Sequence, residues 1–185
     1  MSSIADRGVA ESQALEAAQR GDTSAFNELV LSYQSTVYNV ALRMLRNPED
    51  AHDIAQTVFM KAYQNLANYD PQYKFYSWIY RMAINESLNI LRVRDRNAGP
   101  VDERLPADDA GPSDLLVDDQ RRDVVLEAVG RLKPEHRAVI VLRYFVDRNY
   151  EDMAEILGID AKTVKSRLYT ARQLLKEQLA LRGVL

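Results

Sequence analysis

Apolar residues recur at spacings of three and four along much of the chain, with polar residues between them. This periodicity predicts amphipathic helices. The first long stretch opens after Asp22, and its apolar face consists of Phe26, Leu29, Val30, Tyr33, Val37, Val40, Ala41 and Met44. One face of this long helix is therefore expected to be buried.

A second helix is predicted to start at Pro48. Asn47 is suited to the N-cap, proline is favoured at the first helical position, and Glu49 and Asp50 lie at the positive end of the helix dipole. Its buried stripe is expected to be Ala51, Ile54, Ala55, Val58, Phe59, Ala62, Tyr63 and Leu66. Its outer face is expected to carry Asp50, Asp53, Gln56, Thr57, Met60 and Lys61. That face is polar apart from an exposed methionine.

A third helix is predicted over residues 76–96, after a loop at residues 68–74. Its apolar positions are Trp78, Ile79, Met82, Ala83, Leu88 and Leu91. Aromatic residues expected at the surface, Tyr69, Tyr73, Phe75, Tyr76 and Tyr80, alternate with the cations Lys74, Arg81, Arg92, Arg94 and Arg96. Such a surface suits single-stranded nucleic acid, because rings stack on unpaired bases at about 1–3 kcal/mol each while cations follow the phosphates. The alternative is that the rings belong to the core.

The second half of the chain predicts shorter helices that end in a helix-turn-helix. A helix containing Val124, Ala128 and Leu132 is followed by one that opens at Pro134. Residues 150–157 form another helix, Gly158 takes a left-handed turn, and a last helix buries Val164, Leu168, Ala171 and Leu175.

The outer face of the last helix carries the chemistry expected of a DNA reader. At 100° per residue it presents Lys162, Ser166, Tyr169 and Gln173, with Lys165 and Thr170 beside them and Arg167 and Arg172 on the flanks. This face fits a major groove, with the arginines placed to contact phosphates. The alternative is a solvated basic helix within a four-helix domain.

Composition and charge refine this picture. The chain has 185 residues, 46% of them hydrophobic, and no cysteine, which excludes disulfides and thiolate metal sites. No stretch approaches the roughly 18 apolar residues of a membrane span, so we expect a cytoplasmic protein. The net charge is -3, but residues 161–185 carry +5 and residues 98–123 carry -5. The acidic stretch also holds three of the chain's prolines, which is typical of a flexible linker.

Two motifs together resemble the extracytoplasmic-function sigma factors of bacterial RNA polymerase. The first is Asn47-Pro-Glu-Asp-Ala-His-Asp-Ile-Ala-Gln-Thr-Val-Phe-Met-Lys-Ala-Tyr63, followed by Phe75-Tyr-Ser-Trp-Ile-Tyr-Arg-Met-Ala-Ile-Asn85. The second is Tyr150-Glu-Asp-Met-Ala-Glu-Ile-Leu-Gly158, followed by Thr163-Val-Lys-Ser-Arg-Leu-Tyr-Thr-Ala-Arg172. The resemblance covers residues 14–179 and keeps the order and spacing of both halves.

The resemblance implies an all-α fold of two small domains joined by a flexible acidic linker. A sigma-2 bundle of three or four helices is expected over residues 10–96, the linker over 97–118, and a sigma-4 helix-turn-helix domain over 119–185. Sigma-2 would bind the β′ clamp of core polymerase through Asp50, Asp53, Gln56, Thr57, Met60 and Lys61. It would capture a base flipped from the minus-10 element with Asn68, Tyr69, Tyr73, Lys74, Trp78, Arg81 and Asn85.

Sigma-4 would read the minus-35 element and contact the polymerase β flap. Its implied DNA residues are Lys162, Thr163, Lys165, Ser166, Arg167, Tyr169, Thr170 and Arg172. Family members often carry arginine where this chain has Lys165 and Thr170, so their base preference does not transfer. The resemblance further implies an anti-sigma factor that covers the polymerase-binding faces, and a role in stress-responsive transcription.

Other classes of protein fit the sequence less well. An enzyme or metal protein is disfavoured because His52 and His136 stand alone, without a helical metal-binding partner or a nucleophile motif. Neither a catalytic residue nor a cofactor is therefore expected. A stand-alone helix-turn-helix regulator remains the alternative, but it leaves the aromatic and basic third helix unexplained.

Overall fold

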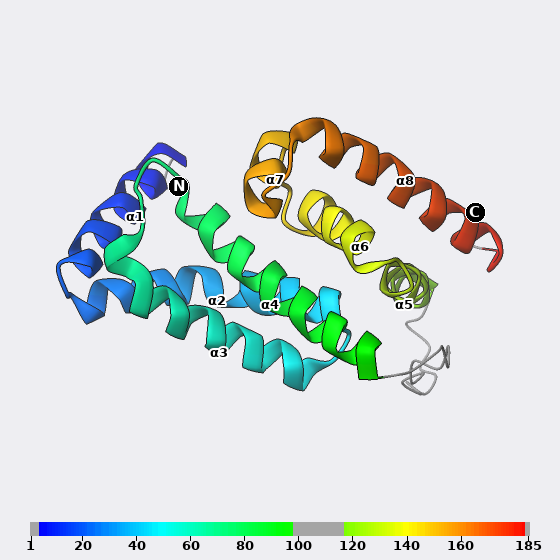
Figure 1. The fold of residues 1–185 in the computed structure, drawn as a ribbon, viewed down its shortest axis with the longest axis horizontal. Helices are drawn as coiled ribbons and strands as arrows, with labels where there is room; N and C mark the ends of the chain where they lie inside the picture. Colours follow the sequence, from blue (N-terminus) through cyan, green and yellow to red (C-terminus); the bar gives the residue numbers. More distant parts are fainter. Residues whose placement is uncertain (1–3, 98–116, 184–185) are drawn as a thin grey trace.

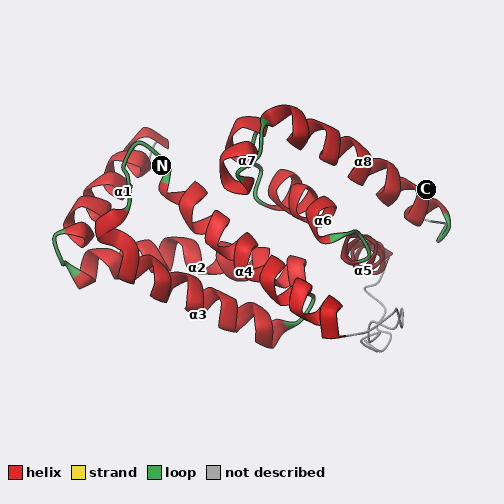
Figure 2. Ribbon diagram, in the orientation of Figure 1, coloured by secondary structure: helices red, strands yellow, loops and turns green. Residues whose placement is uncertain are grey.

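The computed structural model describes residues 4–97 and 117–183, and within these ranges the chain consists of helices joined by short loops (Figures 1 and 2). The predicted all-α fold class is confirmed. In chain order the elements are α1 (Ile4–Gln19), α2 (Thr23–Leu45), α3 (Pro48–Asn65), the 3₁₀ turn η1 (Leu66–Asn68), α4 (Phe75–Asn97), α5 (Val117–Gly130), α6 (Pro134–Ile140), the π-helical segment η2 (Val141–Phe145), α7 (Tyr150–Leu157) and α8 (Ala161–Ala180).

The first half is a bundle in which α2, α3 and α4 pack against one another, with α1 against α2 (Figure 1). The predicted helix starts are confirmed. The Asp22 carboxylate accepts hydrogen bonds from the backbone N–H groups of Ser24 and Ala25 at the start of α2. The Asn47 side chain likewise accepts from the Asp50 N–H, with Pro48 at the first position of α3. The sequence pattern did not predict α1.

The expected exposure of the aromatic residues is wrong in part. Tyr69 and Tyr80 are buried, with relative exposures of 7% and 5%, whereas Phe75, at 1%, follows the alternative that its ring belongs to the core. Tyr69 and Phe75 stack their rings edge to face within the bundle, and Tyr80 packs between the two halves of the chain. Tyr63, expected in the buried stripe of α3, is instead 49% exposed, although its ring lies 5.1 Å from that of Phe26. Tyr73 is exposed as expected.

The second half begins with α5, whose first residues fall within the predicted linker. The rest of that linker, from residue 98 to 116, lies outside the described residues. Pro134 occupies the first turn of α6 as predicted, but η2, a π-helical segment directly after α6, was not foreseen. The helix-turn-helix is confirmed: Asn149 caps α7, Gly158 ends it at a φ of 64°, and Asp160 caps α8. The stripe Val164, Leu168 and Ala171 is buried.

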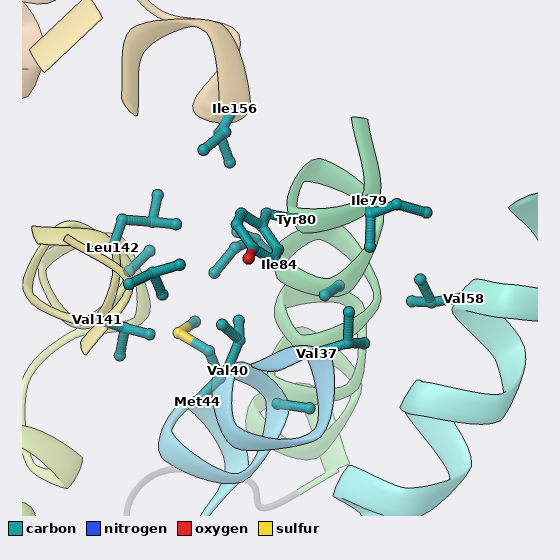
Figure 3. Close-up of a cluster of buried hydrophobic side chains, with 14 of the residues drawn as sticks. Val37, Val40, Met44, Val58, Ile79, Tyr80, Ile84, Val141, Leu142 and Ile156 are labelled. Carbon is teal, nitrogen blue, oxygen red and sulfur yellow. The ribbon is translucent and has the colours of Figure 1, made fainter. Parts of the chain in front are cut away.

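The two halves share one apolar core. Tyr80 and Ile84 of α4, together with Val40 and Met44 of α2, point toward Val141, Leu142 and Ile156 of the second half (Figure 3). Burial of this apolar surface holds α6, η2 and α7 against α2 and α4. The sequence predicted a flexible linker between the two halves. A flexible linker does not imply that the halves pack against each other, so this contact was not predicted. The predicted domain limits remain a prediction.

One buried arginine supports the contact between the halves. The Arg137 guanidinium of α6 donates hydrogen bonds to the carbonyl oxygens of Met44, Gly130 and Leu132. The residues four positions after Met44 and Gly130 are Pro48 and Pro134, which have no N–H to offer these helix-end carbonyls. Burial, with a smaller contribution from Arg46, lowers the pKa of Arg137 to about 10.

Candidate protein and nucleic-acid interfaces

A groove lies between α2 and α3 on the outside of the bundle. It is lined by Val30, Gln34, Ser35, Tyr38, His52, Ala55, Gln56, Thr57, Phe59 and Met60. An adjoining hollow that shares Tyr38 and His52 includes Asp53. The predicted exposure of Met60 is confirmed at 55%, so an apolar side chain stands in a groove with a polar rim.

Only four of the six residues expected to bind polymerase line this groove and the adjoining hollow. Asp53, Gln56, Thr57 and Met60 do so. Asp50 instead forms an ion pair with Arg94 of α4. The Lys61 Nζ lies 2.6 Å from a carboxylate oxygen of Glu86, which also belongs to α4.

Sequence reasoning missed the α2 side of the groove. Gln34, Ser35 and Tyr38 were not recognised as candidates, although they lie between the apolar positions of α2. Gln34 follows Val30 by four residues, and Tyr38 follows Gln34 by four, which places these three side chains along one side of the helix. This spacing was the signal that could have identified them.

Hydrogen bonds and a ring contact hold the loop between η1 and α4 in place. The Tyr69 hydroxyl donates a 2.5 Å hydrogen bond to the carbonyl of Tyr73, and its ring lies 5.1 Å from that of Trp78. Burial raises the pKa of Tyr69 to about 12, so the hydroxyl stays protonated as a donor. From α1, the Gln19 amide donates to the carbonyls of Leu66 and Tyr69, at 3.1 Å each. Tyr69 thus shapes the loop rather than extending from it.

Several of the residues expected to bind the minus-10 element lie along one face of α4 and the loop before it. Trp78, Arg81 and Asn85 follow one another at helical spacings of three and four, which places them on one side of the helix. Arg81 and Asn85 are exposed, as are Asn68 and Tyr73 in the preceding segment. Lys74 stands just before the first residue of α4. The structure therefore places an exposed ring, two cations and an amide along one edge of the bundle.

Most of the outer face of α8 is exposed to solvent. Lys162, Lys165, Ser166, Tyr169, Thr170 and Arg172 are exposed, while Thr163 and Arg167 are half-buried. The Asp160 carboxylate accepts hydrogen bonds from both the N–H and the hydroxyl of Thr163, and it fixes the first turn of the helix. The Thr163 hydroxyl is therefore used in the N-terminal cap of α8. Arg172 donates to the hydroxyl of Tyr144 at 2.7 Å.

The remaining candidate groups show no catalytic arrangement. The imidazole of His52 lies 3.0 Å from the amide of Gln56, and His136 is half-buried in α6. Among residues 4–97 and 117–183, no three His, Asp or Glu side chains are placed to hold a metal ion. None of the helices described has the length and apolar character needed to cross a membrane.

Comparison with protein families finds matches to both halves. The Sigma-70 region 2 model matches residues 29–97, and the Sigma-70, region 4 model matches residues 122–175. The chain is 33% identical over 182 residues to the RNA polymerase sigma-H factor of Pseudomonas aeruginosa. The alignment covers 91% of this chain and 93% of the sigma-H factor. It is 31% identical over 172 residues to the ECF RNA polymerase sigma factor SigW of Bacillus subtilis, covering 87% and 92%.

Solved structures with a similar fold are themselves complexes of two proteins. CnrH, solved with the cytosolic domain of CnrY, superposes with a TM-score of 0.73 at 24% identity, covering 93% of this chain and 98% of that one. RpoE from Bartonella quintana, solved with the anti-sigma factor NepR, superposes with a TM-score of 0.66 at 25% identity, covering 84% and 96%.

Proposed function

The chain belongs to the extracytoplasmic-function sigma factors of RNA polymerase, and we propose that it divides promoter recognition among three separate faces. As a sigma factor it binds core RNA polymerase and directs the start of transcription at particular promoters. The observation that carries the proposal is the separation of the α2–α3 groove, the α4 face and the outer face of α8. Each lies on a different part of the molecule and has a different chemistry.

The α2–α3 groove is proposed as the docking site for the β′ clamp of core polymerase. Its apolar floor, with Phe59 and the exposed Met60, suits the apolar stripe of a partner helix. Asp53 and Gln56 at the rim can fix the orientation of that helix through polar contacts. Asp50 and Lys61 are paired with charged residues of α4 and lie outside the lining of the groove.

The loop and the α4 face are proposed to capture an extruded base of the minus-10 element. Tyr73 offers an exposed ring for stacking, and the Asn85 amide can pair with the edge of a base. Lys74 and Arg81 supply the charge that attracts the phosphates. Tyr69 and Trp78 contribute through the shape of the loop.

The outer face of α8 is proposed to read the minus-35 element in the major groove. Lys165, Ser166, Tyr169 and Thr170 would face base edges, while Arg167 and Arg172 would hold phosphates on either side. The neighbouring Lys162 extends the cationic surface, and the capped Thr163 fixes the angle of the helix.

Two further properties follow from the family. A cytoplasmic location is proposed, since RNA polymerase acts there. Regulation by an anti-sigma factor is also proposed, because the similar structure of RpoE was solved in complex with the anti-sigma factor NepR. Such a partner would cover the groove and the adjoining faces that polymerase needs. It would also block the proposed contact between the sigma-4 half and the β flap of polymerase.

The docking groove can be tested by charge reversal. The double variant Asp53→Lys, Gln56→Ala should weaken binding to core polymerase by about tenfold, because it repels a partner at the rim without entering the core. Binding is measured with labelled chain and purified core enzyme. Glu16→Lys, the same charge change on the exposed surface of α1, is the matched control. Equal affinities of the double variant and the control would refute the groove as the docking site.

The base-capture face is tested by promoter melting. Unstacking a base costs a few kcal/mol, which the protein must recover by binding the extruded base. Asn85→Ala and Tyr73→Ala holoenzymes should therefore form fewer open complexes, seen as lower permanganate reactivity of unpaired thymines. Asn89→Ala, an exposed position one turn further along α4, is the control. A template mismatched at the minus-10 segment should restore transcription in part. Wild-type melting by both variants would remove this face from the proposal.

A further inference from the structure

Two cations on the outer face of α8 are held by tyrosines of the elements that precede it. The Lys165 Nζ lies 5.4 Å from the centre of the Tyr150 ring, at the first position of α7. The Arg172 Nε donates a 2.7 Å hydrogen bond to the hydroxyl of Tyr144, in η2. Seven positions, close to two helical turns, separate the two cations, so both lie along one side of α8. These contacts are made entirely within the second half of the chain.

Tyr150 has a defined place at the start of α7. The preceding residue, Asn149, caps the helix through a side-chain hydrogen bond, and the Tyr150 ring is partly buried against the core. The Arg143 guanidinium lies 5.9 Å from the centre of the same ring and donates to the carbonyl of Arg148 at 3.0 Å. The ring is thus fixed from α7 and from η2, and it offers Lys165 a stationary partner.

Tyr144 points outward from the π-helical segment η2. Val141 and Leu142 of this segment are buried, whereas Tyr144 is 54% exposed. Such π-helical turns occur frequently at functional sites. The contact with Tyr144 uses the Nε of Arg172, so the terminal NH₂ groups of the guanidinium remain donors for a phosphate.

Positioning matters for these two cations because their side chains are long and flexible. A side chain that is ordered only when DNA binds loses conformational freedom at that step, and an earlier contact reduces the loss. A ring or a hydroxyl suits this role, because it does not neutralise the positive charge that attracts the DNA, as a carboxylate would. The ammonium of Lys165 carries three N–H groups, so it also keeps donors for a base edge.

We propose that Tyr150 and Tyr144 are positioning residues for minus-35 recognition, the first through its ring and the second through its hydroxyl. This inference rests on the proposed function of α8, in which Lys165 reads a base and Arg172 holds a phosphate. Tyr150 therefore acts on the preference at one base pair, whereas Tyr144 acts on the affinity for every sequence alike. Loss of the hydroxyl should have opposite consequences at the two positions.

The test measures how the holoenzyme, formed with core RNA polymerase, binds duplexes of one of its promoters that are randomised over the minus-35 segment. Sequencing of the bound duplexes gives the preference at each base pair, and competition with a fixed duplex gives the overall affinity. Lys165→Ala first identifies the base pair that Lys165 reads. Circular dichroism and thermal denaturation of each free variant check that it is folded.

Tyr150→Leu should reduce the preference at that base pair about threefold, the size expected for one exposed cation–π contact. Tyr150→Phe keeps the ring and should match the native chain. In the Lys165→Ala background, Tyr150→Leu should cause no further loss at this base pair. A merely structural role of Tyr150 would instead weaken binding to all sequences alike.

Tyr144→Phe should weaken binding to all sequences about threefold and leave the preference at each base pair unchanged, because one hydrogen bond to Arg172 is lost. Arg172→Ala should also weaken all sequences alike, and it should lower the salt slope by about one. In that background, Tyr144→Phe should have no further effect, since the hydroxyl then has no guanidinium to hold.

The role of Tyr150 is overturned if Tyr150→Phe loses as much preference as Tyr150→Leu, or if Tyr150→Leu matches the native chain. Native-like binding by Tyr144→Phe would overturn the role of Tyr144. Failure of the underlying function gives a different result. Lys165→Ala would then leave every base preference unchanged and Arg172→Ala would leave the salt slope unchanged, whatever the tyrosine variants did.

Discussion

Replacement of Arg137 by methionine should lower the stability of the whole chain by about 1 kcal/mol. The substitution keeps the length of the side chain and removes the donors to three carbonyls. A hydrogen bond from a charged donor contributes about 1.5 kcal/mol at the low end of the usual range. Against this, the pKa of Arg137 falls from 12.5 to about 10, which corresponds to a burial cost of roughly 3 kcal/mol. Three such bonds contribute about 4.5 kcal/mol and exceed this cost by about 1 kcal/mol.

Urea and thermal denaturation of the full chain measure this difference. A loss of about 1 kcal/mol should lower the melting temperature by roughly 2–4 °C in a chain of this size. Because the Met44 carbonyl belongs to the first half and the Gly130 carbonyl to the second, both halves should unfold in one shifted transition. Arg20→Met, at an exposed arginine directly after α1, should change stability by less than about 0.5 kcal/mol. The reasoning is refuted if Arg137→Met matches that control, or if only one of two separate transitions moves.

Three smaller perturbations test other parts of the second half. Gly158→Ala should lower the free energy of unfolding by about 1 kcal/mol, measured by thermal denaturation, because alanine is disfavoured at a φ of 64°. The added Cβ would meet no atom within 4 Å, so no clash adds to this loss, and Gly158→Asn should lower stability less. Glu127 is held by Arg182, which lowers its pKa to about 2, so its contribution to stability is present above the unfolded pKa of about 4.3 and is lost as the pH falls toward 2. Glu127→Gln should therefore melt lower than the native chain at pH 7 but not at pH 2, and a constant difference would contradict the assignment. Lys165→Ala should lower the binding free energy for the minus-35 duplex by about 1–3 kcal/mol and relax the preference at one base pair. Arg167→Ala should weaken binding to all duplex sequences alike, as measured in competition assays.

The features read correctly from the sequence depend on neighbouring residues. Asn47 before Pro48, and Gly158 after the helix at residues 150–157, define the ends of helices through hydrogen bonds and backbone angles within a few positions. Hydrophobic spacing then places the stripes that close each bundle. These local rules were sufficient for the all-α fold and for the position of the recognition helix on the surface.

The features that the sequence did not reveal depend on distant partners. Tyr80 is buried by residues more than fifty positions further along the chain, and nothing near Tyr80 signals them. Tyr69 turns inward because Phe75 and Trp78 provide an aromatic site for its ring. Asp50 and Lys61 belong by spacing to the outer face of α3, but charges on α4 engage both.

The single tryptophan of the chain, Trp78, lies beside the loop of the proposed minus-10 face, with its ring 5.1 Å from that of Tyr69 and 5.9 Å from that of Phe75. Excitation near the red edge of protein absorbance selects this indole over the ten tyrosines. The unlabelled protein therefore carries its own optical reporter at the place where a base would enter. A change in emission when polymerase or a single strand is added would time the rearrangement of this loop in stopped-flow experiments, without any modification of the chain.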